Sequence, residues 1–129
     1  MVRAKKSESD RPSELEMQIL SVLWNNGPQT VRQVLDSMPD GKARAYTTIL
    51  SMMQSMAKKG LIQKQGKDGT AHVFVATRSQ DAVLKPMIGQ MVEHFFLGNR
   101  HAMVQMLFDG EVGQEEMDQI KAILNKEST

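Results

Sequence analysis

The 129-residue sequence predicts a mainly α-helical fold with one small β-hairpin. Two observations predict it. Apolar residues recur with a helical period of about 3.6 residues in three segments between Leu15 and Lys59. The period then changes to 2 between Leu61 and Ala76, where a glycine-rich turn separates two short runs. Three helices followed by a hairpin make up a winged helix-turn-helix domain, and further helical periodicity follows it.

Capping signals delimit the first two helices. Ser13 and Glu16 form a capping-box pattern that predicts a helix start, and the pair Gly27-Pro28 predicts its end. Thr30 and Gln33 repeat the pattern at the start of a shorter helix. The apolar positions expected in the core are Leu15, Ile19, Val22, Leu23 and Trp24 in the first helix and Val31, Val34, Leu35 and Met38 in the second.

The third helix is expected from about Ala45 to Lys59, with Gly60 as its C-cap. A hairpin should follow, with strands at 61–65 and 70–76 and its tip at 66–69. On the second strand, Ala71, Val73 and Val75 share one face and His72 and Phe74 the other. The side of the third helix expected to be buried consists of Ile49, Leu50, Met53, Met56 and Ala57.

Helical patterns at 83–96, 102–108 and 114–125 predict a helical C-terminal region, whose first segment is apolar around most of its circumference. Pro86 leaves two alternatives: the helix begins near it, or it bends there. We expect a disordered arm at 1–11, the winged helix-turn-helix domain at 12–78 and a helical dimerisation region at 79–129. The residues expected to form the dimer are Val83, Met87, Ile88, Met91, Phe95, Phe96, Met117, Ile120, Ile123 and Leu124.

Composition argues against several classes of function. The chain has no cysteine, which removes disulfides, thiolate ligands and cysteine nucleophiles. Its three histidines lack metal-ligand spacing and no phosphate-binding glycine motif occurs, so we expect no metal, no cofactor and no catalytic residue. The charged N-terminus is unlike a signal peptide, and no apolar run reaches the ~20 residues that span a membrane. We therefore expect a cytoplasmic protein without membrane insertion.

Charge is distributed unevenly along the chain. Residues 1–78 carry 12 Lys and Arg against 7 Asp and Glu, whereas residues 79–129 carry 4 against 8. Between Gly41 and Lys67 there are six cations and no acid. A segment of this kind suits a polyanion, and the alternative is an ordinary solvated surface.

The third helix carries a polar face opposite its core face. An exposed helix normally carries Glu for ion pairs four residues apart, so the missing acids favour contact with DNA. Hydroxyl and amide side chains can contact base edges, and the flanking cations can contact phosphates. Tyr46 suits either a half-buried anchor or a contact to the sugar-phosphate backbone. The residues expected to bind DNA are Lys42, Arg44, Tyr46, Thr47, Thr48, Ser51, Gln54, Ser55, Lys58, Lys59, Lys64 and Lys67.

Three short motifs occur together in the first 48 residues: Ser-Glu-Leu-Glu at 13–16, Val-Leu-Trp at 22–24 and Ala-Tyr-Thr-Thr at 45–48. With them the chain resembles the BlaI/MecI family of penicillinase repressors, which are winged-helix transcriptional regulators, and the resemblance is strong over 12–76. It implies a homodimeric repressor on a pseudo-palindromic operator, with the third helix in the major groove and the C-terminal helices forming the dimer. It also implies a membrane sensor-protease as a partner, which ends repression by cutting the repressor in its C-terminal part.

The chain departs from the family pattern in two places. It has neither the cysteines of copper-responsive members nor the Asn-Phe dipeptide cut in the penicillinase branch, so the inducing signal stays open. Two other functions fit the same fold: a ligand-sensing regulator of the MarR type with a methionine-lined pocket, and a winged-helix module that binds proteins. The acid-free segment argues against the second, because a protein partner does not demand it.

Overall fold

The computed structural model describes residues 11–128, so the arm expected at 1–11 lies outside the described residues apart from Arg11. The chain divides into two compact units, Met1–Leu84 and Lys85–Thr129. The expected boundary between 78 and 79 falls just before helix α5, which begins at Gln80, whereas the division into units falls within that helix.

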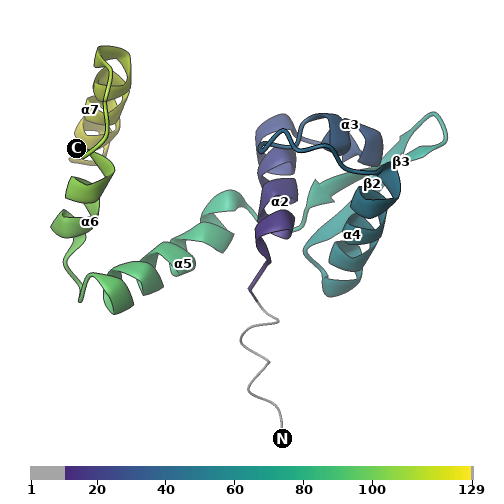
Figure 1. Ribbon diagram of the computed structural model, residues 1–129, viewed down its shortest axis with the longest axis horizontal. Helices are drawn as coiled ribbons and strands as arrows, with labels where there is room; N and C mark the ends of the chain where they lie inside the picture. Colours follow the sequence, from purple (N-terminus) through teal and green to yellow (C-terminus); the bar gives the residue numbers. More distant parts are fainter. Residues whose placement is uncertain (1–10, 129) are drawn as a thin grey trace, which may run out of the picture. The chain divides into compact units, whose positions relative to one another are not determined.

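The first unit confirms the predicted mainly α-helical fold with a hairpin (Figure 1). Helix α4 packs against α2, α3 and β2, and the hairpin of β2 and β3 extends beyond the helices. This order of three helices and a hairpin is the winged helix-turn-helix arrangement. The elements are α2 (Glu14–Asn26), β1 (Gln29–Thr30), α3 (Val31–Asp36), α4 (Tyr46–Lys59), β2 (Ile62–Asp68) and β3 (Ala71–Ala76).

Both predicted capping boxes are present. The Ser13 hydroxyl accepts from the Glu16 amide at 3.2 Å, and the Glu16 carboxylate accepts from the Ser13 amide at 2.9 Å. Thr30 and Gln33 exchange the same two bonds at 3.2 and 2.9 Å. These side chains satisfy backbone N–H groups that a helix start leaves without partners, which fixes where α2 and α3 begin.

Helix α4 ends where the sequence predicts, at Gly60. This residue adopts a left-handed conformation (φ 85°), which only glycine reaches at little cost. Its amide donates to the Ala57 carbonyl, and the next amide, from Leu61, donates to Met56 at 2.9 Å. The chain therefore leaves the helix in a tight turn and enters β2 at once.

The core of the first unit is formed by α2, α3, α4 and the two long strands. The predicted stripes are confirmed, with Leu15, Trp24, Leu35, Leu50 and Ala57 partly buried at their edges. On β3, Phe74 is buried, whereas His72 on the same face, nearer the hairpin tip, is exposed. The buried apolar residues are Ile19, Leu20, Val22, Leu23, Val31, Val34, Met38, Ile49, Met53, Met56, Ile62 and Phe74.

The sheet has three antiparallel strands in the order β1-β3-β2, one more than the sequence predicts. Two residues, Gln29 and Thr30, are too few to show a period, and they pair with Phe74 and Val73. The predicted hairpin tip at 66–69 is also wrong. A bulge between Lys64 and Gly66 lets β2 continue to Asp68, so the turn lies at 69–70.

Pro86 lies inside α5 (Gln80–Phe95), so the alternative in which the helix begins near this proline is wrong. The start is set earlier, because the Ser79 hydroxyl accepts from the Ala82 amide at 3.1 Å. Proline has no N–H to donate to the carbonyl four residues before it, here that of Ala82. The Arg78 guanidinium donates to that carbonyl instead, at 3.3 Å, while its own carbonyl accepts from the Trp24 indole at 2.9 Å.

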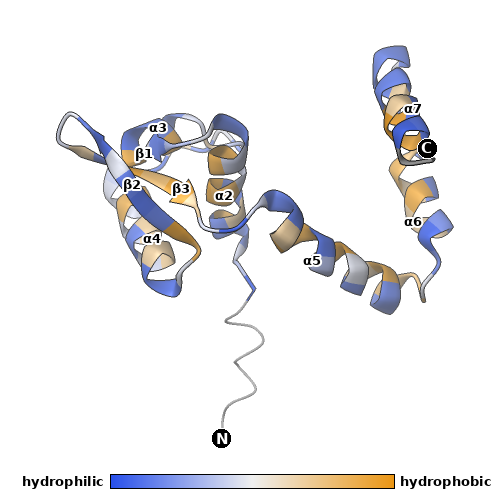
Figure 2. Ribbon diagram, turned by 180° about the vertical axis from the view of Figure 1, so that it is seen from behind, coloured by the Kyte–Doolittle hydropathy of each residue, from blue (hydrophilic) through white to orange (hydrophobic). Residues whose placement is uncertain are grey.

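The second unit contains the remainder of α5 and the helices α6 (Arg100–Leu107) and α7 (Gln114–Ser128). Leu97 and Gly98 have positive φ angles and end α5, after which the Asn99 side chain caps α6 by accepting from the Ala102 amide at 3.1 Å. Apolar residues recur along all three helices between hydrophilic ones (Figure 2). In the single chain, no described residue of α5, α6 or α7 is buried.

Candidate nucleic-acid interface

Helix α4 presents the polar face that the sequence predicts. Ile49, Met53 and Met56 are fully buried on one side of the helix. A shallow hollow on the other side is lined by Thr47, Thr48, Ser51, Met52 and Ser55. The predicted contact residues of this helix after Tyr46 are all exposed, and none is acidic: Thr47, Thr48, Ser51, Gln54, Ser55, Lys58 and Lys59.

Arg44 lies in the loop before α4 and is not a free cation. Its two terminal nitrogens donate to the two carboxylate oxygens of Asp40 at 3.0 and 2.6 Å. The Lys42 amide also donates to Asp40, at 3.0 Å. The Arg44 guanidinium and the Lys42 amide hold the pKa of Asp40 well below its usual range. Ala45 gives α4 no side-chain cap, and the Asp40–Arg44 pair links the two ends of the loop that leads into the helix.

Lys59, at the other end of α4, also has a carboxylate partner. Its ammonium lies 2.7 Å from the Glu16 carboxylate, which is buried in the first turn of α2. The six cations of the acid-free segment therefore fall into two groups, because Asp40 and Glu16 lie outside that segment and pair with two of them. Among the described residues, no carboxylate pairs with Lys42, Lys58, Lys64 or Lys67.

The hairpin of β2 and β3, here called the wing, carries two lysines, a histidine and one acid, Asp68 at its tip. Lys67 pairs with His72 in the strand register, and Lys64 pairs with Phe74 next to it. Lys64 lowers the pKa of His72, with partial desolvation and Lys67 adding to the effect. The two cations that the sequence predicts to contact phosphates therefore disfavour the charged form of the imidazole.

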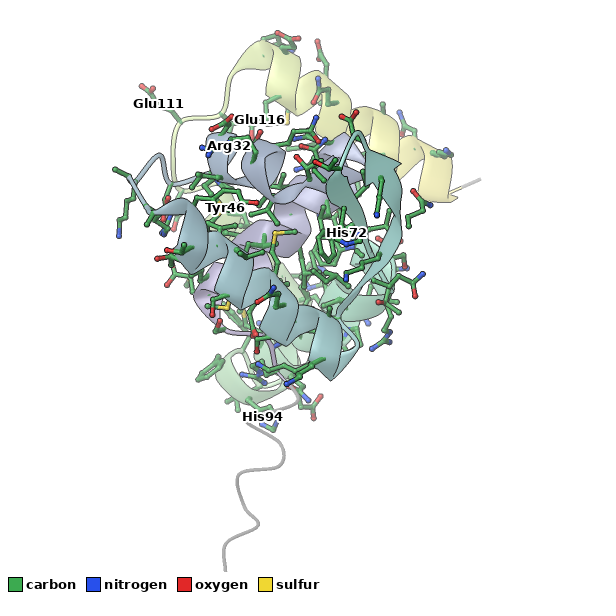
Figure 3. All side chains as sticks on the ribbon, turned by 90° about the vertical axis from the view of Figure 1, so that its right-hand side faces the viewer. Arg32, Tyr46, His72, His94, Glu111 and Glu116 are labelled. Carbon is green, nitrogen blue, oxygen red and sulfur yellow. The ribbon has the colours of Figure 1, made fainter. Side chains whose placement is uncertain are left out.

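A groove runs between α4 and the wing, and it brings together residues that sequence reasoning did not connect. We call it the α4–wing groove; its volume is about 490 Å³. At the groove, the Arg32 guanidinium lies over the Tyr46 ring, 4.9 Å from its centre (Figure 3). His72, from the wing, also lines the groove. The lining residues are Thr30, Val31, Arg32, Tyr46, Leu50, Gln54, Ala57, Lys58, Lys64, Thr70, Ala71, His72 and Phe74.

Arg32 is the residue of this site that the sequence analysis missed. It follows a capping box in a short helix, and nothing in its spacing links it to the third helix. Tyr46 is 39% exposed; its ring lines the groove, and the Arg32 guanidinium covers part of it. The only signal in the sequence that could have pointed to Arg32 was its positive charge.

The residues expected to form a dimer lie in α5 and α7, apart from Phe96, which directly follows α5, and are at most partly buried in the single chain. Phe95 is 79% exposed, and Ile123 and Leu124 are 61% and 62% exposed. Ile88 and Met91 are each 45% exposed, whereas Val83, Met87, Phe96, Met117 and Ile120 are partly buried. Leu97, Met106 and Leu107 add further exposed apolar surface nearby in sequence, which was not predicted.

No helix among residues 11–128 combines the length and apolar character needed to cross a lipid bilayer. Over the same residues, histidines and carboxylates do not gather in groups of three or more that could hold a metal ion.

A winged helix-turn-helix unit followed by a helical unit places the chain in the winged-helix class of proteins. The family model described as penicillinase repressor matches residues 12–126. Two curated relatives, each called transcriptional regulator BlaI, come from the CDC 1551/Oshkosh and H37Rv strains of Mycobacterium tuberculosis. Each is 31% identical over 116 residues, covering 88% of this chain and 83% of the relative. The chain belongs to the penicillinase repressor family, a family of transcriptional repressors, and the expected resemblance is confirmed.

Proposed function

We propose that this repressor acts as a homodimer on a pseudo-palindromic DNA operator. In this proposal, helix α4 of each subunit lies in the major groove and the wing follows the neighbouring backbone. The observation that carries it is the exposed, acid-free face of α4, which continues into a wing with two lysines that lack carboxylate partners. Such a surface attracts phosphates, and the one acid of the wing, Asp68, lies at the tip of the hairpin.

The residues of this face divide by their chemistry. Thr47, Thr48 and Ser51 lie in the first half of α4, the end of a recognition helix that usually reaches base edges. Lys58 lies ~16 Å from Thr47 along the helix axis, at about 1.5 Å per residue, and is placed for backbone phosphates. We assign Gln54 and Ser55 to the bases, and Lys42, Lys64 and Lys67 to phosphates.

Arg44 and Lys59 have a different role in this proposal. Each has a carboxylate at 2.6 or 2.7 Å, so each brings little net charge to a phosphate. We assign them to holding the two ends of α4, and Tyr46 with Arg32 to the backbone beside the groove.

The dimer is assigned to the second unit. Exposed side chains such as Phe95, Met91 and Leu124 give α5 and α7 more apolar surface than a monomer of this size normally shows to water. A two-fold dimer would place two α4 helices about 34 Å apart, or at a multiple of that distance, on successive major grooves. We place this repressor in the cytoplasm, where its DNA lies. A membrane sensor-protease is the further partner that we carry over from the family resemblance.

The salt dependence of DNA binding tests the division of the cations. Changing Lys42, Lys58, Lys64 or Lys67 to alanine should flatten the plot of log K against log salt by about 1 per subunit, or ~2 per dimer. The matched variants Arg44→Ala and Lys59→Ala should flatten it by less than half as much. Unchanged slopes in all four lysine variants would remove the assignment of this surface to DNA.

A further inference from the structure

The α4–wing groove has the size of a small-molecule site. Its volume of about 490 Å³ falls within the range of roughly 300–1,000 Å³ found for ligand pockets. It is built within the first unit alone, from α3, α4 and the wing. No methionine lines it, so it differs from the methionine-lined pocket considered for a ligand-sensing regulator.

Charge around the groove has one sign. Arg32, Lys58 and Lys64 reach it from α3, α4 and β2, and His72 adds a titratable nitrogen from β3. No acid lines the groove, and among the described residues neither Lys58 nor Lys64 has a carboxylate partner. Convergent cations without counter-charges are complementary to an anion.

The apolar floor of the groove sets a second requirement for the molecule that binds there. Val31, Leu50, Ala57 and Phe74 contribute apolar side chains to it, and the ring of Tyr46 is partly exposed beside them. A bare phosphate would satisfy the cations but leave this apolar surface in water. An occupant with an apolar body and one anionic group would cover both, which is the usual composition of a ligand pocket.

We propose that the α4–wing groove binds a small organic anion with an apolar body, and that this occupant weakens DNA binding. The second part rests on the proposed function. Gln54, Lys58 and Lys64 line the groove and also belong to the surface assigned to DNA. An anion held by these lysines removes their charge from the phosphates, so the two ligands oppose each other and the effect is reciprocal.

The first test is direct binding of 2-naphthoate to the full chain, without DNA. Calorimetry should show saturable binding, and amide NMR shifts should centre on the lining residues of α4 and β3. Lys64→Gln should weaken binding about tenfold, the value of a charge-assisted hydrogen bond. Lys67→Gln is the matched control, because Lys67 lies on the same strand but does not line the groove; it should change affinity less than twofold.

Two further compounds test separately whether the groove needs the anionic group and the apolar body of its ligand. 2-Naphthalenemethanol has the apolar body without the charge, and inorganic phosphate has the charge without the body; both should bind at least tenfold more weakly than 2-naphthoate. If phosphate binds the same residues as tightly, the site is a seat for backbone phosphate and the proposal is overturned. Three other results would also overturn it: a lack of saturable binding, NMR shifts confined to α5–α7, or equal losses of 2-naphthoate affinity in the Lys64 and Lys67 variants.

The second test adds DNA. Saturating 2-naphthoate should weaken binding to a duplex about tenfold relative to sodium acetate at the same concentration, which matches the ionic strength. Unchanged duplex affinity at saturation would overturn the proposed antagonism. A chain that binds 2-naphthoate in the groove but binds no duplex at low salt would instead refute the proposed function and leave the site standing.

Discussion

The ammonium of Lys59 lies 2.7 Å from the carboxylate of Glu16 and joins the last turn of α4 to the first turn of α2. Glu16 is only 3% exposed and also accepts the Ser13 amide of its capping box. One carboxylate therefore starts a helix and holds the far end of α4. Together with the Asp40–Arg44 pair before that helix, it anchors both ends of the proposed reading element.

The neighbouring residues Lys58 and Lys59 should differ in how much each contributes to the free energy of unfolding. Lys59→Ala should lower the free energy of unfolding by about 1–2 kcal/mol, because it leaves the buried Glu16 carboxylate without its cation. The cost is below that of a fully buried pair, since the Lys59 side chain is 47% exposed. Lys58→Ala, the adjacent exposed control, should stay within about 0.5 kcal/mol. Urea unfolding measures both, and equal losses would contradict the assignment.

Acid should weaken the fold through the same carboxylate. Burial raises the pKa of Glu16, but the hydrogen bonds from Lys59 and Ser13 lower it by more, so it lies below the ordinary value of 4.5. The folded state thus binds this proton less readily than the unfolded state. Its stabilising contribution is complete above pH 4.5 and is lost as pH falls through the folded pKa. Unfolding measured from pH 6 to pH 3 should show this loss.

Two glutamates of the same turn provide the comparison for that experiment. Glu16→Gln should remove part of the pH dependence, because the buried group no longer titrates. Glu14→Gln, an exposed neighbour, should retain the wild-type profile. Indistinguishable profiles for the two variants would show that another group carries the acid sensitivity.

Asp40 should oppose indiscriminate DNA binding. Asp40→Asn frees the Arg44 guanidinium, so the slope of log K against log salt should steepen by about 1 per subunit on scrambled DNA. The same change loosens the loop before α4, so affinity for an operator selected from a random library should fall. Asp36→Asn removes an exposed acid from α3 without touching the pair and serves as the control. Equal slopes in the two variants would contradict this role.

The second unit should determine the oligomeric state. Phe95→Asp or Met91→Asp should dissociate the dimer in sedimentation at micromolar concentration, because each places a charge in exposed apolar surface. Operator affinity should fall with it, since two linked half-sites bind far more tightly than separate ones. Gln105→Asp, an exposed polar position on α6, should leave the dimer intact. A wild-type monomer would refute the assignment of this unit.

Local signals in the sequence were sufficient for the helices. Capping boxes at Ser13 and Thr30 and the C-cap at Gly60 are short-range patterns, and all three are present in the structure. The hairpin tip was misplaced because the bulge near Gln65 depends on pairing with β3. The strand at Gln29 was missed because it exists only through its pairing with Phe74.

Pairings between distant residues limited the prediction of the site. Glu16 and Lys59 are 43 residues apart, so the sequence shows six cations without acids and cannot show which are neutralised. Arg32 joins Tyr46 only because α3 packs against α4. The exposed face of α4, in contrast, follows from helical spacing alone, and all its expected members after Tyr46 are exposed.

Helix α4 is proposed to read the sequence of DNA, and one pair of titrations tests this claim. Wild type, Thr47→Ala, Thr48→Ala and Lys58→Ala are titrated with the selected operator and with a scrambled duplex at one fixed salt concentration. Each threonine variant should lose ~1–3 kcal/mol per half-site on the operator and almost nothing on scrambled DNA, because uncharged hydroxyls release no counterions. Lys58→Ala should weaken both alike. Threonine variants that lose as much on scrambled DNA as on the operator would contradict the claim.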